Sequence, residues 1–245
     1  MEHNFSEVFE KKLISDWSYN SWVSEAEKQL LLKYIKNTNG KTVEAGTGGG
    51  RFAFYSEELL NLEDIVAFDI IPELIAVCRR KAIERNSKVN FILANATNLN
   101  CFKDNEFDNL LYLGQVLSML PEKLIDDALL EAYRIGSSDG VYIFSFMDWN
   151  SRWFNYFLSL PLNMLRFLRG DKVQKYYLPE IKSQTGINLK FFNKGQNCML
   201  WTNMENAFKM LNKANFKIEG SYYEKDLTKS KKGTVIYIIC KKSKN

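Results

Sequence analysis

The residues best suited to chemistry gather in one short segment, Val43-Glu-Ala-Gly-Thr-Gly-Gly-Gly-Arg51. Glycines at positions 46, 48 and 50 stand where an apolar run ends and a helical pattern begins. Glycine lets the backbone turn tightly and approach a ligand, because no Cβ stands in the way. Arg51 and Ala53 depart from the G-x-G-x-x-G dinucleotide fingerprint, and no Gly-Lys-Ser/Thr follows as a P-loop requires. The segment therefore predicts a ligand-binding turn of a different kind.

A carboxylate follows the second apolar run, because Asp69 stands directly after Ile65–Phe68 and 19 residues after Gly50. In a doubly wound sheet, a carboxylate at this position accepts hydrogen bonds from both hydroxyls of a ribose. Glu44 is a second carboxylate, just before the glycines. Together the glycine turn and Asp69 indicate a ligand that contains adenosine.

These residues need a sheet to position them, and the hydrophobic pattern predicts one. Expected strands alternate with expected helices at 42–45, 51–61, 65–68, 72–86, 89–93, 107–113, 121–135 and 141–146, the last strand after an Asp139-Gly140 turn. Such alternation favours βαβ units and a mostly parallel sheet with helices on both faces. The alternation stops near residue 149, and a helix at 203–215 and an antiparallel pair of strands at 216–223 and 234–240 are expected after it.

The motifs, in this order, resemble those of class I S-adenosylmethionine-dependent methyltransferases over roughly residues 41–148. Glu44–Gly50 resembles the family's first motif and Asp69 its ribose-binding acid. Asn95-Ala96 stands where the family has Asp-Ala or Asp-Val beside the adenine, and an amide oxygen can still accept from an adenine amino group. The resemblance implies S-adenosyl-L-methionine as cofactor, bound by Glu44, Gly46, Thr47, Gly48, Gly50, Asp69, Ile70, Asn95, Ala96 and Gln115.

The resemblance also implies the fold and its division. We expect a Rossmann-like seven-stranded α/β sheet, with six parallel strands, one antiparallel edge strand and helices on both faces. Residues 1–40 are then an N-terminal helical lid, 41–148 the cofactor-binding core, 149–200 an insertion over the acceptor side, and 201–245 a helix and two strands that complete the core.

The expected reaction is methyl transfer to a nitrogen or oxygen of a small molecule. Acceptor contacts are expected from Trp17, Tyr19, Trp22, Ser118, Met119, Trp149 and Trp153. A neutral amine needs no base, whereas a hydroxyl acceptor must lose a proton. His3 is the only histidine, so Asp148 or a tyrosine is the candidate base.

Charge divides the chain into two parts, with a net charge of −8 over residues 1–150 and +12 over residues 151–245. Residues 149–200 hold eight Lys and Arg against two acidic residues, which favours an anionic acceptor. Within them, Trp149–Gly170 is apolar but too interrupted for a membrane span. It is interpreted as an interfacial helix on anionic lipid, a cap over the acceptor pocket, extra core or a dimer contact.

Other observations restrict the function classes. Four scattered cysteines without a CxxC pair give no reason to expect a metal site or a redox dithiol. The first residues lack an apolar signal region, so a cytoplasmic protein is expected. The expected oligomeric state is a monomer or a homodimer. RNA or protein methylation is one alternative, although no RNA-binding module is evident and nucleic acid is not expected. A non-catalytic scaffold that binds a cofactor or a partner is the other.

Overall fold

The computed structural model describes residues 14, 17–18, 22–36, 38, 40–179, 182–183, 186–187, 198–229 and 233–243. The predicted Tyr19 contact and His3 lie outside these residues. The expected lid over residues 1–40 is described only in part. Its described helix is α2 (Glu25–Tyr34), which begins at a capping box formed by Ser24 and Glu27.

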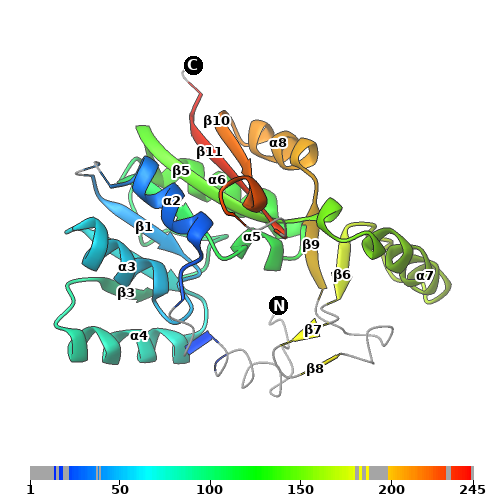
Figure 1. The fold of residues 1–245 in the computed structure, drawn as a ribbon, viewed down its shortest axis with the longest axis horizontal. Helices are drawn as coiled ribbons and strands as arrows, with labels where there is room; N and C mark the ends of the chain where they lie inside the picture. The colour runs from blue at the N-terminus through cyan, green and yellow to red at the C-terminus, as the bar shows by residue number, and fades with distance from the viewer. Residues whose placement is uncertain are drawn as a thin grey trace.

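The centre of the fold is a twisted sheet with the strand order β10-β11-β5-β4-β1-β2-β3 (Figure 1). Its bounds are β1 (Thr42–Ala45), β2 (Ile65–Asp69), β3 (Asn90–Leu93), β4 (Phe107–Tyr112), β5 (Gly136–Asp148), β10 (Phe216–Tyr223) and β11 (Val235–Lys242). Strands β1 to β5 pair in parallel, and β11 pairs antiparallel with both β5 and β10. The expected α/β sheet is therefore confirmed.

Two details of the sheet correct the expectation. The antiparallel strand β11 lies between β5 and β10, so it is not the edge strand. The fifth strand begins at Gly136, and Asp139-Gly140 lies inside it, in a bulge where the register with β4 shifts. The sheet also includes β9 (Cys198–Thr202), which pairs in parallel with β5, and β6 (Tyr177–Pro179), which pairs with β9.

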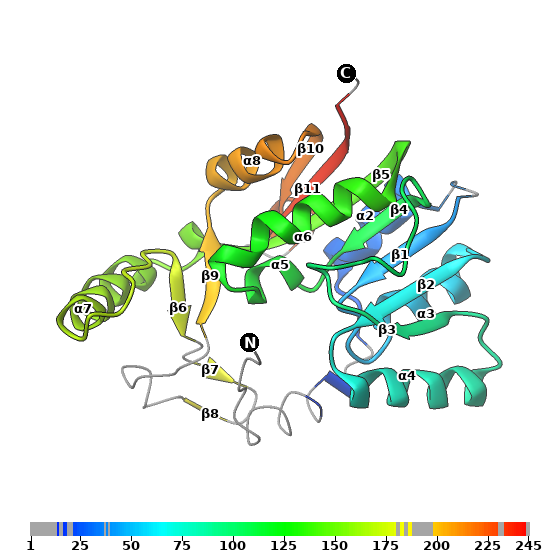
Figure 2. The same cartoon turned by 180° about the vertical axis from the view of Figure 1, so that it is seen from behind.

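Helices cover both faces of the sheet because each has an apolar stripe and each central strand is apolar on both faces (Figures 1 and 2). On one face lie α2, α3 (Arg51–Leu60) and α4 (Pro72–Arg85), whose core residues include Leu30, Phe54 and Cys78. On the other face lie α5 (Val116–Met119), α6 (Glu122–Ile135) and α8 (Met204–Lys213). Pro72 occupies the first turn of α4, as the sequence predicts.

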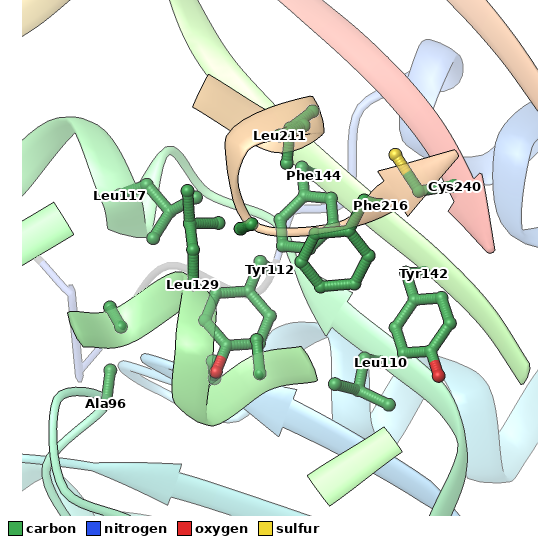
Figure 3. Packing of buried hydrophobic residues seen from close by; sticks show 14 of the residues in the cluster. Ala96, Leu110, Tyr112, Leu117, Leu129, Tyr142, Phe144, Leu211, Phe216 and Cys240 are labelled. Carbon is green, nitrogen blue, oxygen red and sulfur yellow. The ribbon is translucent and has the colours of Figure 1, made fainter. Parts of the chain in front are cut away.

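The larger core lies between the sheet and α6 and α8. Figure 3 shows Phe216 of β10 beside Phe144 of β5 and Leu211 of α8. The rings of Phe144 and Phe216 meet edge to face with centroids 5.1 Å apart. This contact joins β10 to β5, so the C-terminal strands share one hydrophobic core with the parallel strands.

The insertion after β5 contains η1 (Trp149–Ser151), α7 (Phe154–Leu168), β6, β7 (Lys182–Ser183), β8 (Gly186–Ile187) and β9. It forms a small hydrophobic cluster of its own from Trp149, Leu162, Leu178 and Trp201. In both views α7 stands at the end of the molecule opposite α3 and α4 (Figures 1 and 2). Among the described residues, no helix is long and apolar enough to cross a membrane.

Candidate active site

The glycine turn follows β1 at the carboxyl edge of the parallel strands, where ligands of open α/β sheets bind. Gly46, Gly48 and Gly50 all have positive φ, at 60°, 55° and 84°. A Cβ at Gly46 would stand 2.5 Å from a methyl carbon of Val116, the residue that opens α5. The backbone geometry therefore requires glycine at this position.

Glu44 lies under this turn and is almost completely buried. Its Oε2 accepts hydrogen bonds from Thr47 Oγ1 at 2.8 Å and from the Ala53 amide at 2.9 Å. Its Oε1 is buried without a hydrogen-bond partner. Burial raises the pKa of Glu44 to about 8, although the Thr47 hydrogen bond opposes the shift. A buried, unsatisfied carboxylate oxygen at a ligand-binding edge is suited to a cationic donor from a ligand.

Asp69 ends β2 and connects it to the glycine turn. Its Oδ2 accepts from the Gly48 amide at 2.9 Å, and its Oδ1 accepts from the Ile71 amide at 3.1 Å. Burial raises the pKa of Asp69, and these backbone hydrogen bonds oppose the shift. Each oxygen of a carboxylate can accept a second hydrogen bond, so both retain acceptor capacity for a ribose.

The N-terminal segment lies directly on the glycine turn. The carbonyl oxygen of Trp17 occupies the space that a Cβ at Gly49 would need, and the Trp17 side chain is half-buried there. Lys81 of α4 fixes this arrangement, because its Nζ donates to the carbonyl oxygens of Ser18 and Gly49, the latter at 2.9 Å. Burial lowers the pKa of Lys81. Sequence reasoning missed Lys81, since a lysine on a helix is ordinarily a solvated residue.

Arg51 holds the next part of the same segment. Its guanidinium donates to the Trp22 carbonyl oxygen at 2.9 Å and lies 3.6 Å from the buried Glu27 carboxylate. The Trp22 side chain itself is 67% exposed. Trp17 therefore contacts the predicted cofactor turn, whereas Trp22 presents its ring to solvent.

The ends of β3 and β4 carry further predicted cofactor residues. Asn95 is exposed, and its Oδ1 already accepts from the Thr97 amide and hydroxyl, both at 3.0 Å. An adenine contact through that oxygen would have to replace one of these hydrogen bonds. Ala96 is buried in the core beside it. Gln115 has a positive φ of 61°, and its amide donates to Ser145 Oγ at 2.9 Å, which fixes the loop near Gly46.

Three further predicted site residues have distinct surroundings. Ser118 is buried, and its Oγ accepts from the Met147 amide at 3.2 Å, so it joins α5 to β5. Met119 is half-buried. Ile70, next to Asp69, is 61% exposed at the carboxyl edge of β2.

Asp148 ends β5 and is buried among backbone groups. Its Oδ1 accepts from the Asn150 amide at 3.0 Å, which caps η1. Burial raises the pKa of Asp148, and the backbone hydrogen bond and Lys225 oppose the shift. The two tryptophans that follow have opposite environments, because Trp149 is in the insertion's small core and Trp153 is 79% exposed.

The arrangement fits the cofactor that the sequence implies. The unsatisfied Glu44 oxygen suits a positively charged amino group, and Asp69 suits a diol. None of the four cysteines, all of them described, forms a disulfide bond. Within the described part of the chain, no group of His, Cys, Asp and Glu could hold a metal ion.

Comparison of the sequence with known protein families finds one matching family model. A family model described as a methyltransferase domain matches residues 43–140. A comparison with curated proteins finds no significant match.

Solved structures share the fold. A methyltransferase from Methanosarcina mazei superposes with a TM-score of 0.66 at 15% identity, covering 88% of this chain and 98% of that one. A protein from Pyrococcus horikoshii gives 0.64 at 19% identity, with 98% and 93% covered. The Burkholderia thailandensis 1,6-didemethyltoxoflavin N1-methyltransferase, with bound 1,6-didemethyltoxoflavin and S-adenosylhomocysteine, gives 0.63 at 15% identity, with 100% and 91% covered.

The family match begins within β1 and ends within β5, so it contains the glycine turn, Glu44 and Asp69. The cofactor of the matched domain is S-adenosyl-L-methionine. Residues 43–140 therefore form a methyltransferase domain, which transfers methyl groups from this cofactor, and the chain has the fold of solved S-adenosylmethionine-dependent methyltransferases.

Proposed function

We propose that this enzyme methylates a nitrogen or oxygen of a small, anionic molecule. The observation that carries the proposal is the fastening of Trp17 and Ser18 onto the glycine turn by Lys81. A segment of the chain's own backbone covers the cofactor turn, so a small acceptor reaching the site from the insertion side fits better than a large polymer. The excess of basic residues at 149–200 favours an acceptor with a carboxylate or phosphate.

The cofactor, when bound, supplies a methyl group already activated on a sulfonium, so the protein mainly positions the two reactants. Glu44 would receive the amino group of the cofactor, Asp69 would accept from its ribose, and Ile70 and Ala96 lie at the strand ends expected to border its adenine. The turn's Thr47 stabilises the Glu44 carboxylate by a hydrogen bond of 2.8 Å.

For an acceptor hydroxyl, the candidate base is Asp148. Its burial at the carboxyl end of β5 raises its pKa, which makes its carboxylate a better proton acceptor than an exposed one. Its Oδ1 is oriented by the Asn150 amide. We therefore expect Asp148→Asn to reduce turnover of a hydroxyl acceptor while cofactor affinity is retained, and to leave an amine acceptor nearly unaffected.

The test is an acceptor screen of the full chain with S-adenosylmethionine labelled in its methyl group. Small amines and phenols, each with and without a carboxylate, are compared with total RNA and with denatured cellular protein. Labelled product from the carboxylated small molecules is the expected result. Label found only in RNA or only in protein would contradict the proposal and identify a macromolecule as the acceptor. Cofactor binding without product from any acceptor would favour the non-catalytic scaffold.

A further inference from the structure

Unlike an ordinary surface helix, α7 buries a stripe of polar side chains beside Leu162 and exposes a stripe of apolar ones. Its polar side chains face the protein. Asn155 Nδ2 donates to the Trp149 carbonyl at 3.0 Å, and Ser159 Oγ donates to the Lys175 carbonyl at 2.8 Å. Both residues are buried, at 1% and 4% exposure.

The same polar stripe continues to the end of the helix. Asn163 Oδ1 accepts from the Gln174 amide at 2.9 Å. Arg166 donates to the carbonyls of Gln174 at 2.8 Å and Tyr177 at 2.9 Å. Residues 155, 159, 163 and 166 lie at spacings of four, four and three, so they form a single helix face. These hydrogen bonds fix which side of α7 faces outward.

The outward side is apolar and aromatic. Its residues are between 53% and 79% exposed: Trp153, Tyr156, Phe157, Leu160, Met164, Phe167 and Leu168. We call them the α7 apolar face. They recur at spacings of three and four, so they also form one stripe. A contiguous exposed stripe of this kind marks an interaction site, because isolated apolar residues, rather than rows, are the ordinary case.

Charge distinguishes between the surfaces that could cover this face. Residues 149–179 hold five basic residues and only one acidic residue, Asp171. Arg169, Lys172 and Lys175 follow the helix and are exposed. Lys172 pairs with Glu122 of α6 at 2.8 Å, an exposed ion pair that contributes little. If α7 packed against α7 of a second copy, two segments that each carry an excess of basic residues would meet, whereas an anionic surface is complementary.

We propose that the α7 apolar face binds to the surface of a membrane that contains anionic lipid. Fifteen residues make a helix about 22 Å long, which can lie in the plane of the interface. Trp153 and Tyr156 are residue types enriched where lipid meets water, and the basic residues would attract lipid headgroups. Helix α7 stands at the opposite end of the molecule from α3, the helix that begins at the glycine turn (Figure 2). This inference does not depend on which acceptor is methylated.

The experiment is cosedimentation of the full chain with two kinds of vesicle. One contains phosphatidylcholine and phosphatidylglycerol in equal parts, and the other contains phosphatidylcholine alone. The test variant is Trp153→Gln with Phe157→Gln, which removes apolar area without adding charge. The matched control is Ile83→Gln, since Ile83 is 82% exposed on α4, far from α7. Sedimentation velocity without lipid gives the oligomeric state of each variant, and circular dichroism tests its folding.

We expect binding to the anionic vesicles that weakens by roughly tenfold or more in the double variant and is unchanged in Ile83→Gln. Binding should also weaken steeply with salt. Equal binding to both vesicles would overturn the role of anionic lipid. A lipid-free dimer that the double variant dissociates, with no vesicle binding, would assign the face to a second copy. A monomer that binds neither vesicle would overturn the proposal outright.

Discussion

Cofactor binding should release protons from Glu44, and the structure sets the amount. Burial raises the pKa of Glu44 to about 8 in the ligand-free protein. At pH 7 a group with that pKa is about 90% protonated. A cationic amino group placed at the unsatisfied Oε1 favours the ionised carboxylate, so binding should release about 0.9 proton at pH 7 and about 0.5 at pH 8. The apparent affinity should increase about tenfold per pH unit well below pH 8.

The assay is isothermal titration calorimetry with S-adenosylmethionine at pH 7, in buffers of different ionisation enthalpy. The dependence of the binding heat on the buffer gives the number of protons released. Glu44→Gln is the matched control, because it keeps the size of the side chain and one acceptor oxygen but cannot titrate. It should bind more weakly and release no proton from this site. Tight binding by the wild-type protein with no proton release, and with affinity independent of pH, would refute the reasoning.

The same shift has a consequence for stability. The folded-state pKa of Glu44, about 8, is above its unfolded value of 4.5, so the folded state binds more protons between these values. The stabilisation is fully present below about pH 4.5 and is lost as the pH rises through 8. A pKa shift of one unit corresponds to about 1.4 kcal/mol, so the Glu44 shift changes the free energy of unfolding by at most about 5 kcal/mol. Urea denaturation of the ligand-free protein should show this loss, and Glu44→Gln should reduce it.

Three further predictions test the turn and its cover. Gly46→Ala should lower the free energy of unfolding by about 1–3 kcal/mol in urea titrations, because its φ is 60° and the new Cβ would meet Val116. Adding Val116→Ala to Gly46→Ala should restore only the part of this free energy that is lost to the steric clash with Val116. Asp69→Asn should weaken cofactor binding by about 1–3 kcal/mol in calorimetry, since an amide group cannot accept at both of its ends. Lys81→Met should release the Trp17–Ser18 backbone, which limited proteolysis would detect as faster cleavage near residue 18.

The parallel part of the fold could be predicted from local sequence, because each strand and helix carries its own hydrophobic period. The position of the antiparallel strand could not. The period of β11 shows that it is a strand, but its place between β5 and β10 depends on contacts between distant residues, such as Ile238 with Phe144. The predicted start of β5, at residue 141, was wrong for a related reason. Asp139-Gly140 has the composition of a turn, yet in this chain it forms a bulge within a paired strand.

The cofactor side of the site shows the same division. Gly46, Glu44 and Asp69 could be found because their chemistry depends on positions next to strand ends, which the sequence pattern locates. Lys81 could not, because its function comes from two backbone carbonyls that lie 63 and 32 residues away along the chain. The acceptor side has no such motif, and Trp149 and Trp153, only four residues apart, have opposite environments.

Helix α7 shows why periodicity alone leaves the acceptor side open. The spacing of Trp153, Phe157 and Leu160 predicts an amphipathic helix, and the usual rule would place this stripe against the core. The rule assumes that the polar stripe has only water as a partner. Here Asn163 and Arg166 instead form hydrogen bonds with the backbone of Gln174 and Tyr177, in the segment that leads into β6. Because these hydrogen bonds hold the polar stripe against the segment after α7, that stripe faces inward. The apolar stripe must then face outward, and its burial requires a surface that lies outside the chain's own core.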